Sequence, residues 1–493
     1  MKRFIWLLLL ISMFIGCSRK EKTLYVVFSY APLTHIPNVR AEIVTSSILM
    51  NFYDPLIRFD EDFRPTPGLA EYWENPDSLT WIFHLRKGIK FQTGENFSSK
   101  DVIYTFHRIA SDPGSDYRAE ISSIDTIITP DSYTVIFKLK TPCSTYLERI
   151  GQILIMKNHC PDSLLMTYSC GTGALKYVKT DEKGNIHAIP NPEYFGENVE
   201  FDEIVFTAEK VPIPSHKKTK DANYFLYTFS PPEELSREYG FMRVPGPLNA
   251  VRYIGINTKQ KFLNKKSFRK AIYLAICRER LADSVKKLYN YPVIPAYEMA
   301  LPSQIGFSFY KPEDCVLKDS IKKLLEISGY DGSSINILVG TSKKIYADLV
   351  QKYLEKVGIN LKVEAVEAHE LFTRVKDTGN FSLYILGLIP QSIDIYSTTE
   401  AHFHTQNIKK SLGVKNYYGY SNPTLDSLLE TVTHATTKRK REQILQRIES
   451  ILTDDVPVIP ILYEGNNFYL SPELRWKPRI DRLIFVNEIK IKQ

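Results

Sequence analysis

The side chains that could do chemistry are few, and their spacings do not match the common catalytic patterns. His369 and Glu370 begin the HExxH pattern of zinc proteases, but Thr373 stands where the second histidine is needed. The chain carries neither the GxSxG turn of hydrolases nor the glycine-rich loop before Lys-Ser or Lys-Thr that holds nucleotide phosphates. We therefore expect neither enzyme activity nor a cofactor.

A second group of polar residues, Glu400, His402 and His404, occupies alternate positions. On a strand, these three side chains would point to one face, as the ligands of a metal ion do. The same residues also fit ordinary polar positions on a surface or in a cleft. We favour the second interpretation and expect no metal.

Cys17 is the residue most clearly placed for modification. Two basic residues precede an almost unbroken apolar run, Phe4–Ile15, which has the length of a signal-peptide core and is shorter than a bilayer span of about 20 residues. A glycine and Cys17 follow, and the chain then turns polar. This order resembles the lipobox of bacterial lipoproteins. We expect residues 1–16 to be a signal peptide and residues 17–22 a lipidated tether; a plain secretory signal or an uncut anchor is the alternative.

The remaining cysteines are five, an odd number that argues against a complete disulfide framework in an exported protein. Cys160 and Cys170 are close enough in sequence to close a small loop, and Cys143 is an alternative partner. Buried thiols are equally compatible with these positions. Cys277 and Cys315 complete the set, and no spacing is that of a zinc or redox pair.

Bulk composition limits the class of protein. A chain of 493 residues exceeds one ordinary core, so two or three domains are expected. With 43% hydrophobic and 24% charged residues it is globular. The net charge of +7 is spread over short basic runs without a nucleic-acid-binding motif, so a nucleic-acid partner is not expected.

The elements that would position a site alternate between strands and helices. In the first half, periodicity predicts strands over 23–28, 79–85 and 132–139 and helices over 40–53 and 99–110, the latter capped by Ser98. In the second half, it predicts helices over 267–281, 318–328, 342–357 and 424–452 and strands over 359–366 and 381–389. The pattern indicates two α/β lobes.

Several short blocks along the chain form a recognisable series: Pro67–Trp73 (PGLAEYW), Phe83–Gly94 (FHLRKGIKFQTG), Gly171–Leu175 (GTGAL), Asn191–Gly196 (NPEYFG), Phe268–Ile276 (FRKAIYLAI), Leu324–Tyr330 (LLEISGY), Gly419–Pro423 (GYSNP) and Val456–Pro460 (VPVIP). In content and order they resemble the blocks of extracellular solute-binding protein family 5, the dipeptide-, oligopeptide- and nickel-binding components of ABC importers. They cover essentially the whole chain after the leader.

The resemblance implies an α/β, two-lobed periplasmic-binding-protein-like fold (type II, cluster C) with an extra subdomain on the first lobe. By analogy, lobe I uses residues 23–49, 172–250 and 464–493. The extra subdomain is expected over 50–171, and lobe II over 251–463. Two segments cross between the lobes, which close on the solute like a hinge.

The resemblance also implies where ligand binds. In peptide-binding members, a Trp-x-x-Asp segment after a buried strand supplies a carboxylate for the peptide's α-ammonium group; here Leu388 and Gln391 stand at those two positions, and Asp394 follows three residues later. Either Asp394 takes over this role or the ligand is not a free-amine peptide, because a neutral amide compensates a desolvated ammonium poorly. The further candidate ligand-binding residues are Tyr30, Gly173 and His402.

The expected function is therefore capture of a small solute, foremost a short peptide, for an ABC permease and its ATPase, by a monomeric protein held at the cell envelope through a lipid anchor. An oligosaccharide, a metal chelate or a receptor that reports its solute to a signalling partner is the alternative.

Overall fold

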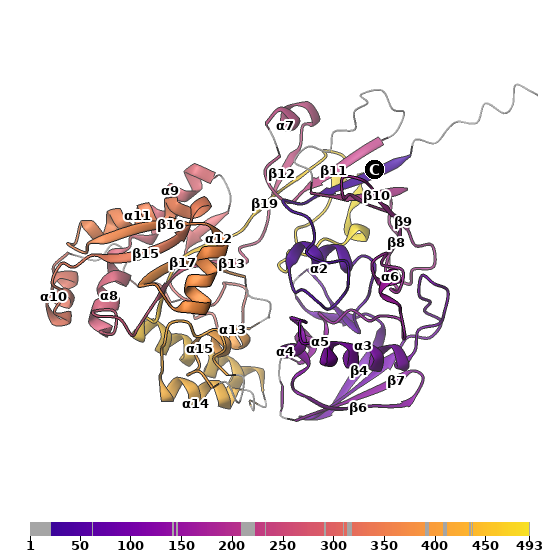
Figure 1. Cartoon of the computed structure of the whole chain (residues 1–493), viewed down its shortest axis with the longest axis horizontal. Coiled ribbons are helices and arrows are strands. Elements are labelled where there is room, and N and C mark those ends of the chain that lie inside the picture. The colour runs from indigo at the N-terminus through magenta and orange to yellow at the C-terminus, as the bar shows by residue number, and fades with distance from the viewer. Residues whose placement is uncertain are drawn as a thin grey trace, which may run out of the picture.

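The computed structural model describes residues 21–61, 63–140, 142–143, 146–208, 222–231, 233–289, 292–308, 310–312, 318–389, 394–407, 412–432, 435 and 437–492. Within these residues, the chain forms two lobes that stand side by side, each built on its own large sheet (Figure 1). The first lobe contains segments from both ends of the chain, coloured indigo and yellow. The second lobe is built from later segments of the chain, which are mostly orange. The predicted two-lobed α/β class is confirmed.

The first lobe is built on a seven-stranded sheet. Its central strand β1 (Lys22–Val27) runs parallel to both neighbours, β10 (Glu203–Thr207) and β11 (Ala222–Tyr227). The outer strands pair antiparallel and are β8 (Leu175–Thr180), β9 (Ile186–Pro190), β12 (Met242–Pro245) and β19 (Asn467–Leu470). Successive side chains of a strand face opposite sides of its sheet, and β1 is buried on both.

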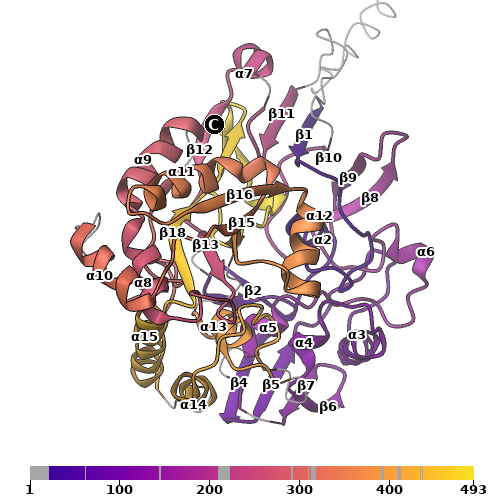
Figure 2. The same ribbon diagram turned by 60° about the vertical axis from the view of Figure 1, so that its left-hand side comes forward.

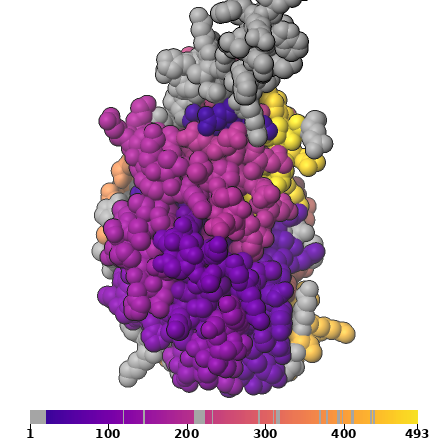
Figure 3. Space-filling view, turned by 90° about the vertical axis from the view of Figure 1, so that its right-hand side faces the viewer, coloured from indigo at the N-terminus to yellow at the C-terminus, as the bar shows by residue number. Residues whose placement is uncertain are grey.

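The C-terminal segment packs on this first lobe. Its short strands β20 (Leu474–Arg475) and β21 (Lys490–Ile491) pair with each other, and the apolar residues between them join the core under β1. Figure 3, which views this lobe from outside, shows the yellow C-terminal residues bordering the magenta and indigo ones on one continuous surface. The two short helices α6 (Asp162–Leu165) and α7 (Glu233–Tyr239) complete the lobe.

Helix α2 (Ile43–Leu49) begins later than the predicted helix over 40–53, because a side chain sets its start; it also ends earlier. The carboxylate of Glu42 accepts hydrogen bonds from the backbone N–H groups of Val44 (2.6 Å) and Thr45 (3.0 Å). Such a cap satisfies N–H groups that have no partner inside the helix. The cap also places Glu42 at the inner edge of the first lobe.

The extra subdomain holds an antiparallel four-stranded sheet in the order β4-β5-β7-β6, with a core of its own. Its strands are β4 (Ala70–Asp77), β5 (Thr80–Leu85), β6 (Ile124–Asp131) and β7 (Thr134–Leu139), next to the hairpin of β2 (Ile57–Phe59) and β3 (Pro65–Pro67). Helix α3 (Ser99–Ser111) begins in a capping box formed by Ser98 and Asp101. The short helices α4 (Arg118–Ile121) and α5 (Tyr146–Ile150) lie on the side of the second lobe (Figure 1).

The second lobe has a six-stranded mixed sheet in the order β14-β18-β13-β17-β15-β16. These strands are β13 (Ala250–Ile256), β14 (Val293–Pro295), β15 (Ile335–Gly340), β16 (Leu361–Val366), β17 (Leu383–Leu388) and β18 (Val458–Glu464). Two separate cores show that helices cover both faces (Figure 2). The helices are α8 (Lys266–Ala275), α9 (Arg278–Tyr289), α10 (Lys318–Ser328), α11 (Lys344–Glu355), α12 (Ala368–Phe372), α13 (Tyr396–Phe403), α14 (Pro423–Val432) and α15 (Lys438–Asp455).

Two helices that the sequence predicts as continuous are each divided in the structure. The helix over 267–281 breaks between α8 and α9, where the Arg278 guanidinium donates to the carbonyl oxygens of Tyr273 and Ile276 and so satisfies the end of α8. The helix over 424–452 is α14 and α15; Thr437 caps the second helix. Periodicity alone does not reveal the first break, because apolar residues such as Ile272, Ile276 and Leu281 recur on both sides of it.

Two crossing segments connect the lobes, from β12 to β13 and from β18 to β19. They touch at glycines: the N–H of Gly246 donates to the carbonyl oxygen of Asn466 at 2.7 Å. A Cβ atom at Gly465 would lie 2.7 Å from the carbonyl oxygen of Pro247. Two backbones can approach this closely only where side chains are absent.

Candidate functional site

A cavity of about 330 Å³ lies between the lobes. The first lobe contributes Glu42, Arg58 and the C-terminal segment around Arg479, and the second contributes Leu301 and Ile389, among others. The cavity extends to the crossing segments through Asn249, whose amide donates to the carbonyl oxygen of Ile480 at 3.0 Å. Its volume lies at the lower end of the range for ligand pockets.

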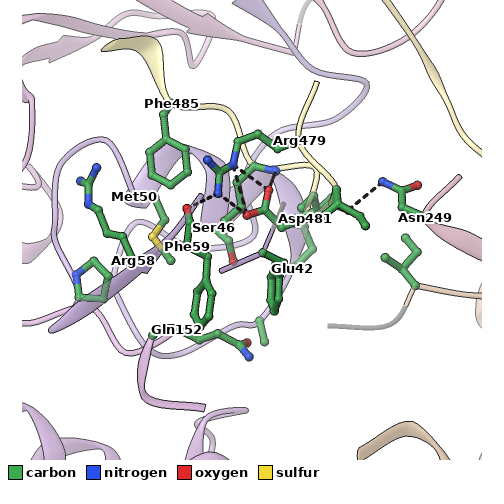
Figure 4. A pocket seen from close by; sticks show the side chains of 18 of the residues that line it. Glu42, Ser46, Met50, Arg58, Phe59, Gln152, Asn249, Arg479, Asp481 and Phe485 are labelled. Carbon is green, nitrogen blue, oxygen red and sulfur yellow. Dashed lines mark hydrogen bonds and ion pairs between the residues drawn. The ribbon is translucent and has the colours of Figure 1, made fainter. Parts of the chain in front are cut away.

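The walls are largely apolar and aromatic. Figure 4 shows the side chains of Met50, Phe59 and Phe485 around the cavity, together with polar groups from α2 and the C-terminal segment. From the second lobe, Ile389 is 39% exposed at the cavity edge, directly after β17. An apolar lining with a few placed polar groups is the usual composition of a small-molecule or peptide site.

Arg58 and Arg479 are held by carboxylates of the same lobe. The Arg58 guanidinium pairs with Asp54 and lies over the ring of Phe485, with its carbon 5.2 Å from the ring centre. Arg479 pairs with Asp481 at 2.7 Å and with Glu488 at 2.9 Å. It also donates to the backbone carbonyl of Phe59. These contacts fix both cations in the cavity wall and compensate their charge.

Glu42 has a different environment. Besides capping α2, its carboxylate accepts hydrogen bonds from the hydroxyl groups of Tyr30 and Thr45. Burial and the nearby Glu42 carboxylate raise the pKa of Tyr30 above its ordinary value, so Tyr30 stays a neutral donor. No cation is paired with Glu42 among the residues that the structure describes.

Of the candidate ligand-binding residues from the sequence, Tyr30 lines this cavity. Leu388 ends β17 and packs partly buried in the core of the second lobe; its neighbour Ile389 lines the cavity instead. Gln391 lies outside the described residues. The structure thus brings Tyr30 and the end of β17 to the same cleft from opposite lobes.

Asp394 is not presented as the unpaired carboxylate that its predicted role requires. Its side chain accepts a hydrogen bond from Arg441 at 2.6 Å and another from the backbone N–H of Tyr396 at 2.9 Å. The residue is 2% exposed, and Arg441 also donates to the last carbonyl of α14, Val432. Asp394 thus joins α13, α14 and α15 inside the second lobe, where its charge is already compensated.

The structure also corrects the prediction for Gly173, which packs against backbone and does not line the cavity. Its N–H donates to the carbonyl oxygen of Phe52 at 2.9 Å, and its carbonyl accepts from Asn191 at 2.9 Å. A Cβ atom at this position would lie 2.6 Å from the carbonyl oxygen of Asn51. Glycine is needed here for close chain packing.

His402 is likewise part of a core and not of the cavity. It lies on α13, buried near the hydroxyl of Tyr418, and burial lowers the pKa of His402 to about 3, so the imidazole is neutral. The helix also removes the alternate arrangement of Glu400, His402 and His404, because residues two apart on a helix do not share a face. No cluster of three or more metal-binding side chains occurs among the described residues.

Cys160 and Cys170 form a disulfide with their Cα atoms 6.2 Å apart, and both are buried in the first lobe. Cys277 is also disulfide-bonded, which the sequence analysis did not predict. Cys143 is half buried beside the core of the extra subdomain. Cys17 and Cys315 lie outside the described residues.

Comparison with known proteins identifies the family. The model for bacterial extracellular solute-binding proteins, family 5 middle, matches residues 64–410. The chain belongs to this family. The periplasmic oligopeptide-binding protein OppA of Salmonella typhimurium is 23% identical over 475 residues, which cover 87% of this chain and 84% of that protein.

Solved structures show that the family 5 fold extends over nearly the whole chain. The periplasmic binding protein DppA of Helicobacter pylori, in complex with the peptide STSA, has a TM-score of 0.75 and 21% identity, covering 96% of this chain and 99% of that one. NikZ of Campylobacter jejuni, in complex with Ni(L-His), has a TM-score of 0.77 and 17% identity, covering 96% and 100%. The predicted family and fold are confirmed.

Sequence reasoning missed the charged residues that line the cavity in this family 5 protein, namely Glu42, Arg58, Arg479 and Asp481. A signal for Glu42 was present, since a negatively charged residue is favoured near the N-terminus of a helix. Arg58 and Arg479 carry no local signal, because they are separated by most of the chain and meet only through the packing of the C-terminal segment on the first lobe.

Proposed function

We propose that this protein is the solute-binding component of an ABC importer and that its ligand is a short peptide. The observation that carries the proposal is a single cavity lined by both lobes and reaching the segments that connect them. A solute in such a cavity contacts both lobes at once, so binding favours the closed arrangement. Membership of family 5 and the peptide-binding role named for its relative OppA support the same conclusion.

In this proposal, the two lobes close on the solute by rotating about the crossing segments, and the closed form is the one that delivers solute for transport. The close contact around Gly246 and Gly465 concentrates rotation in a few residues, which is the usual geometry of a hinge. The membrane permease recognises the closed, loaded form, and the associated ATPase supplies the energy for import. A monomer is part of the proposal; the fact that one chain supplies both walls of the cavity is compatible with it.

Export and anchoring belong to the same proposal. A signal peptide over 1–16 and a lipid on Cys17 would hold the binding protein beside the membrane whose permease it serves. Among the described residues, no helix combines the length and the apolar character needed to cross a bilayer. Mass spectrometry of the mature protein tests this: an acylated N-terminal Cys17 is expected, and a leader that is kept or cut elsewhere contradicts it.

Native mass spectrometry of the protein purified from its own host tests the ligand class. Co-purifying masses that fragment as short peptides are the expected result. A co-purifying oligosaccharide or metal chelate would refute the peptide assignment while leaving the solute-binding fold intact.

A further inference from the structure

The charged groups at the cavity differ in whether their charge is compensated. The guanidinium groups of Arg58 and Arg479 each have a carboxylate partner in the same lobe. The Glu42 carboxylate accepts only from neutral donors, namely two backbone N–H groups of α2 and the hydroxyls of Tyr30 and Thr45. A carboxylate accepts about four hydrogen bonds, so Glu42 is satisfied in hydrogen bonding but not in charge.

The side chains that line the cavity include two guanidinium groups, Arg58 and Arg479, and two carboxylates, Glu42 and Asp481. With their direct ion-pair partners included, the side chains at the cavity comprise two guanidiniums and four carboxylates, namely Arg58, Arg479, Glu42, Asp54, Asp481 and Glu488. Burial raises the pKa of Glu488, but an excess of negative charge remains even when that carboxyl is protonated. It contrasts with the net charge of +7 on the chain. A cleft with low-dielectric walls focuses such a field on its ligand.

We propose that Glu42 receives a positive charge of the ligand, as an ammonium or guanidinium group. The cation takes the place of the Tyr30 hydroxyl on the carboxylate, while the backbone N–H groups of α2 keep Glu42 oriented. Tyr30 is 43% exposed, so its side chain can turn away without opening a core. Exchange of a neutral donor for a cation strengthens the hydrogen bond and compensates the charge.

This assignment rests on the proposed function. It supplies a carboxylate for the cation of the ligand, which the segment after β17 does not offer. Asp394 is paired with Arg441 inside the second lobe. Glu42 supplies the missing negative charge from the first lobe, on the opposite wall of the same cavity that Ile389 lines. The ligand class that fits is a peptide with a free α-amino group or a basic side chain.

Isothermal titration calorimetry with wild type and Glu42→Gln tests the assignment. The probes are trialanine, N-acetyl-trialanine and N-acetyl-Ala-Lys-Ala, which carry an α-ammonium group, no cation and a side-chain cation, respectively. We expect the substitution to weaken binding of the preferred cationic probe by about 30-fold, equivalent to about 2 kcal/mol, with little effect on N-acetyl-trialanine. The cationic probe that loses affinity identifies the source of the charge.

Asp101→Asn is the matched control, because Asp101 also belongs to a helix cap but lies in the extra subdomain away from the cavity. It should weaken its cap without changing the preference among the three probes. If Glu42→Gln binds all probes as wild type does, Glu42 is only a cap and the inference fails, whereas the proposed function stands. A wild type that binds none of the three probes overturns both.

Discussion

Replacing Glu449 by Gln should remove a large part of the pH dependence of stability. Glu449 is 1% exposed on α15, and one of its carboxylate oxygens accepts from the backbone N–H of Met299 at 3.3 Å. Burial, with the nearby Glu298 carboxylate adding to it, raises the pKa of Glu449 from 4.5 to about 8. The folded protein therefore holds this carboxyl neutral at neutral pH, whereas the unfolded chain ionises it.

The sign follows from the raised pKa. The neutral carboxyl contributes its full stability below pH 4.5, and this contribution is lost progressively as the pH rises through about 8. The difference between the two pKa values corresponds to about 5 kcal/mol in total, of which about 3 kcal/mol is already lost at pH 7. The glutamine side chain of the variant cannot ionise, and its amide oxygen can still accept the Met299 N–H.

Urea unfolding of wild type and Glu449→Gln at pH 5, 6, 7 and 8 measures this difference. Wild type should lose stability relative to the variant over this range, by about 3 kcal/mol or more. Glu326→Gln, at an exposed position of α10, is the control and should follow wild type at each pH. Parallel pH profiles for wild type and Glu449→Gln would show that Glu449 ionises in the folded protein, which would refute the reasoning.

Three further changes test other parts of the structure. Arg441→Met leaves the Asp394 carboxylate buried without its cation and should cost about 3–5 kcal/mol in urea unfolding; Arg441→Met combined with Asp394→Asn should recover much of this loss. Gly465→Ala brings a Cβ atom to 2.7 Å from a backbone oxygen of the other crossing segment, so ligand-induced compaction measured by small-angle X-ray scattering should be impaired; unchanged compaction would place the hinge elsewhere. Cys170→Ser opens a loop with a sequence separation of 10 from Cys160 and should lower stability by about 2–3 kcal/mol, whereas an unaltered thermal midpoint would contradict this.

Local patterns predicted the elements well where one physical signal dominated. The helix over 318–328 agrees with α10, because its apolar stripe ends at Gly329, which adopts a positive φ of 69°. The capping residue Ser98 marks the start of α3 in the same way. The breaks after α8 and α14 were missed. Arg278 satisfies the carbonyl oxygens of Tyr273 and Ile276 at the end of α8, and Arg441 donates to the carbonyl oxygen of Val432 at the end of α14.

The candidate site also shows what the sequence predicts and what only the folded structure reveals. Tyr30 was predicted as a cleft residue and lines the cavity, whereas Ile389, directly after β17, lines it in place of the predicted Leu388. Asp394, Gly173 and His402 are residues of the expected types in the expected regions. Their partners, however, are an arginine from α15, the backbone near Phe52 and a tyrosine hydroxyl in a core, none of which is local in sequence.

The sequence by itself determined the family, the α/β class and the alternation of helices and strands, because these depend on periodicity, caps and motif order along the chain. Only the tertiary structure decided which charged side chains have no counter-charge among the described residues and so can pair with a ligand. Compensation of a charge depends on distance in space, and ion pairs such as that of Asp394 with Arg441 join residues far apart in sequence. The same packing leaves Glu42 with neutral partners at the cavity, which no local pattern records.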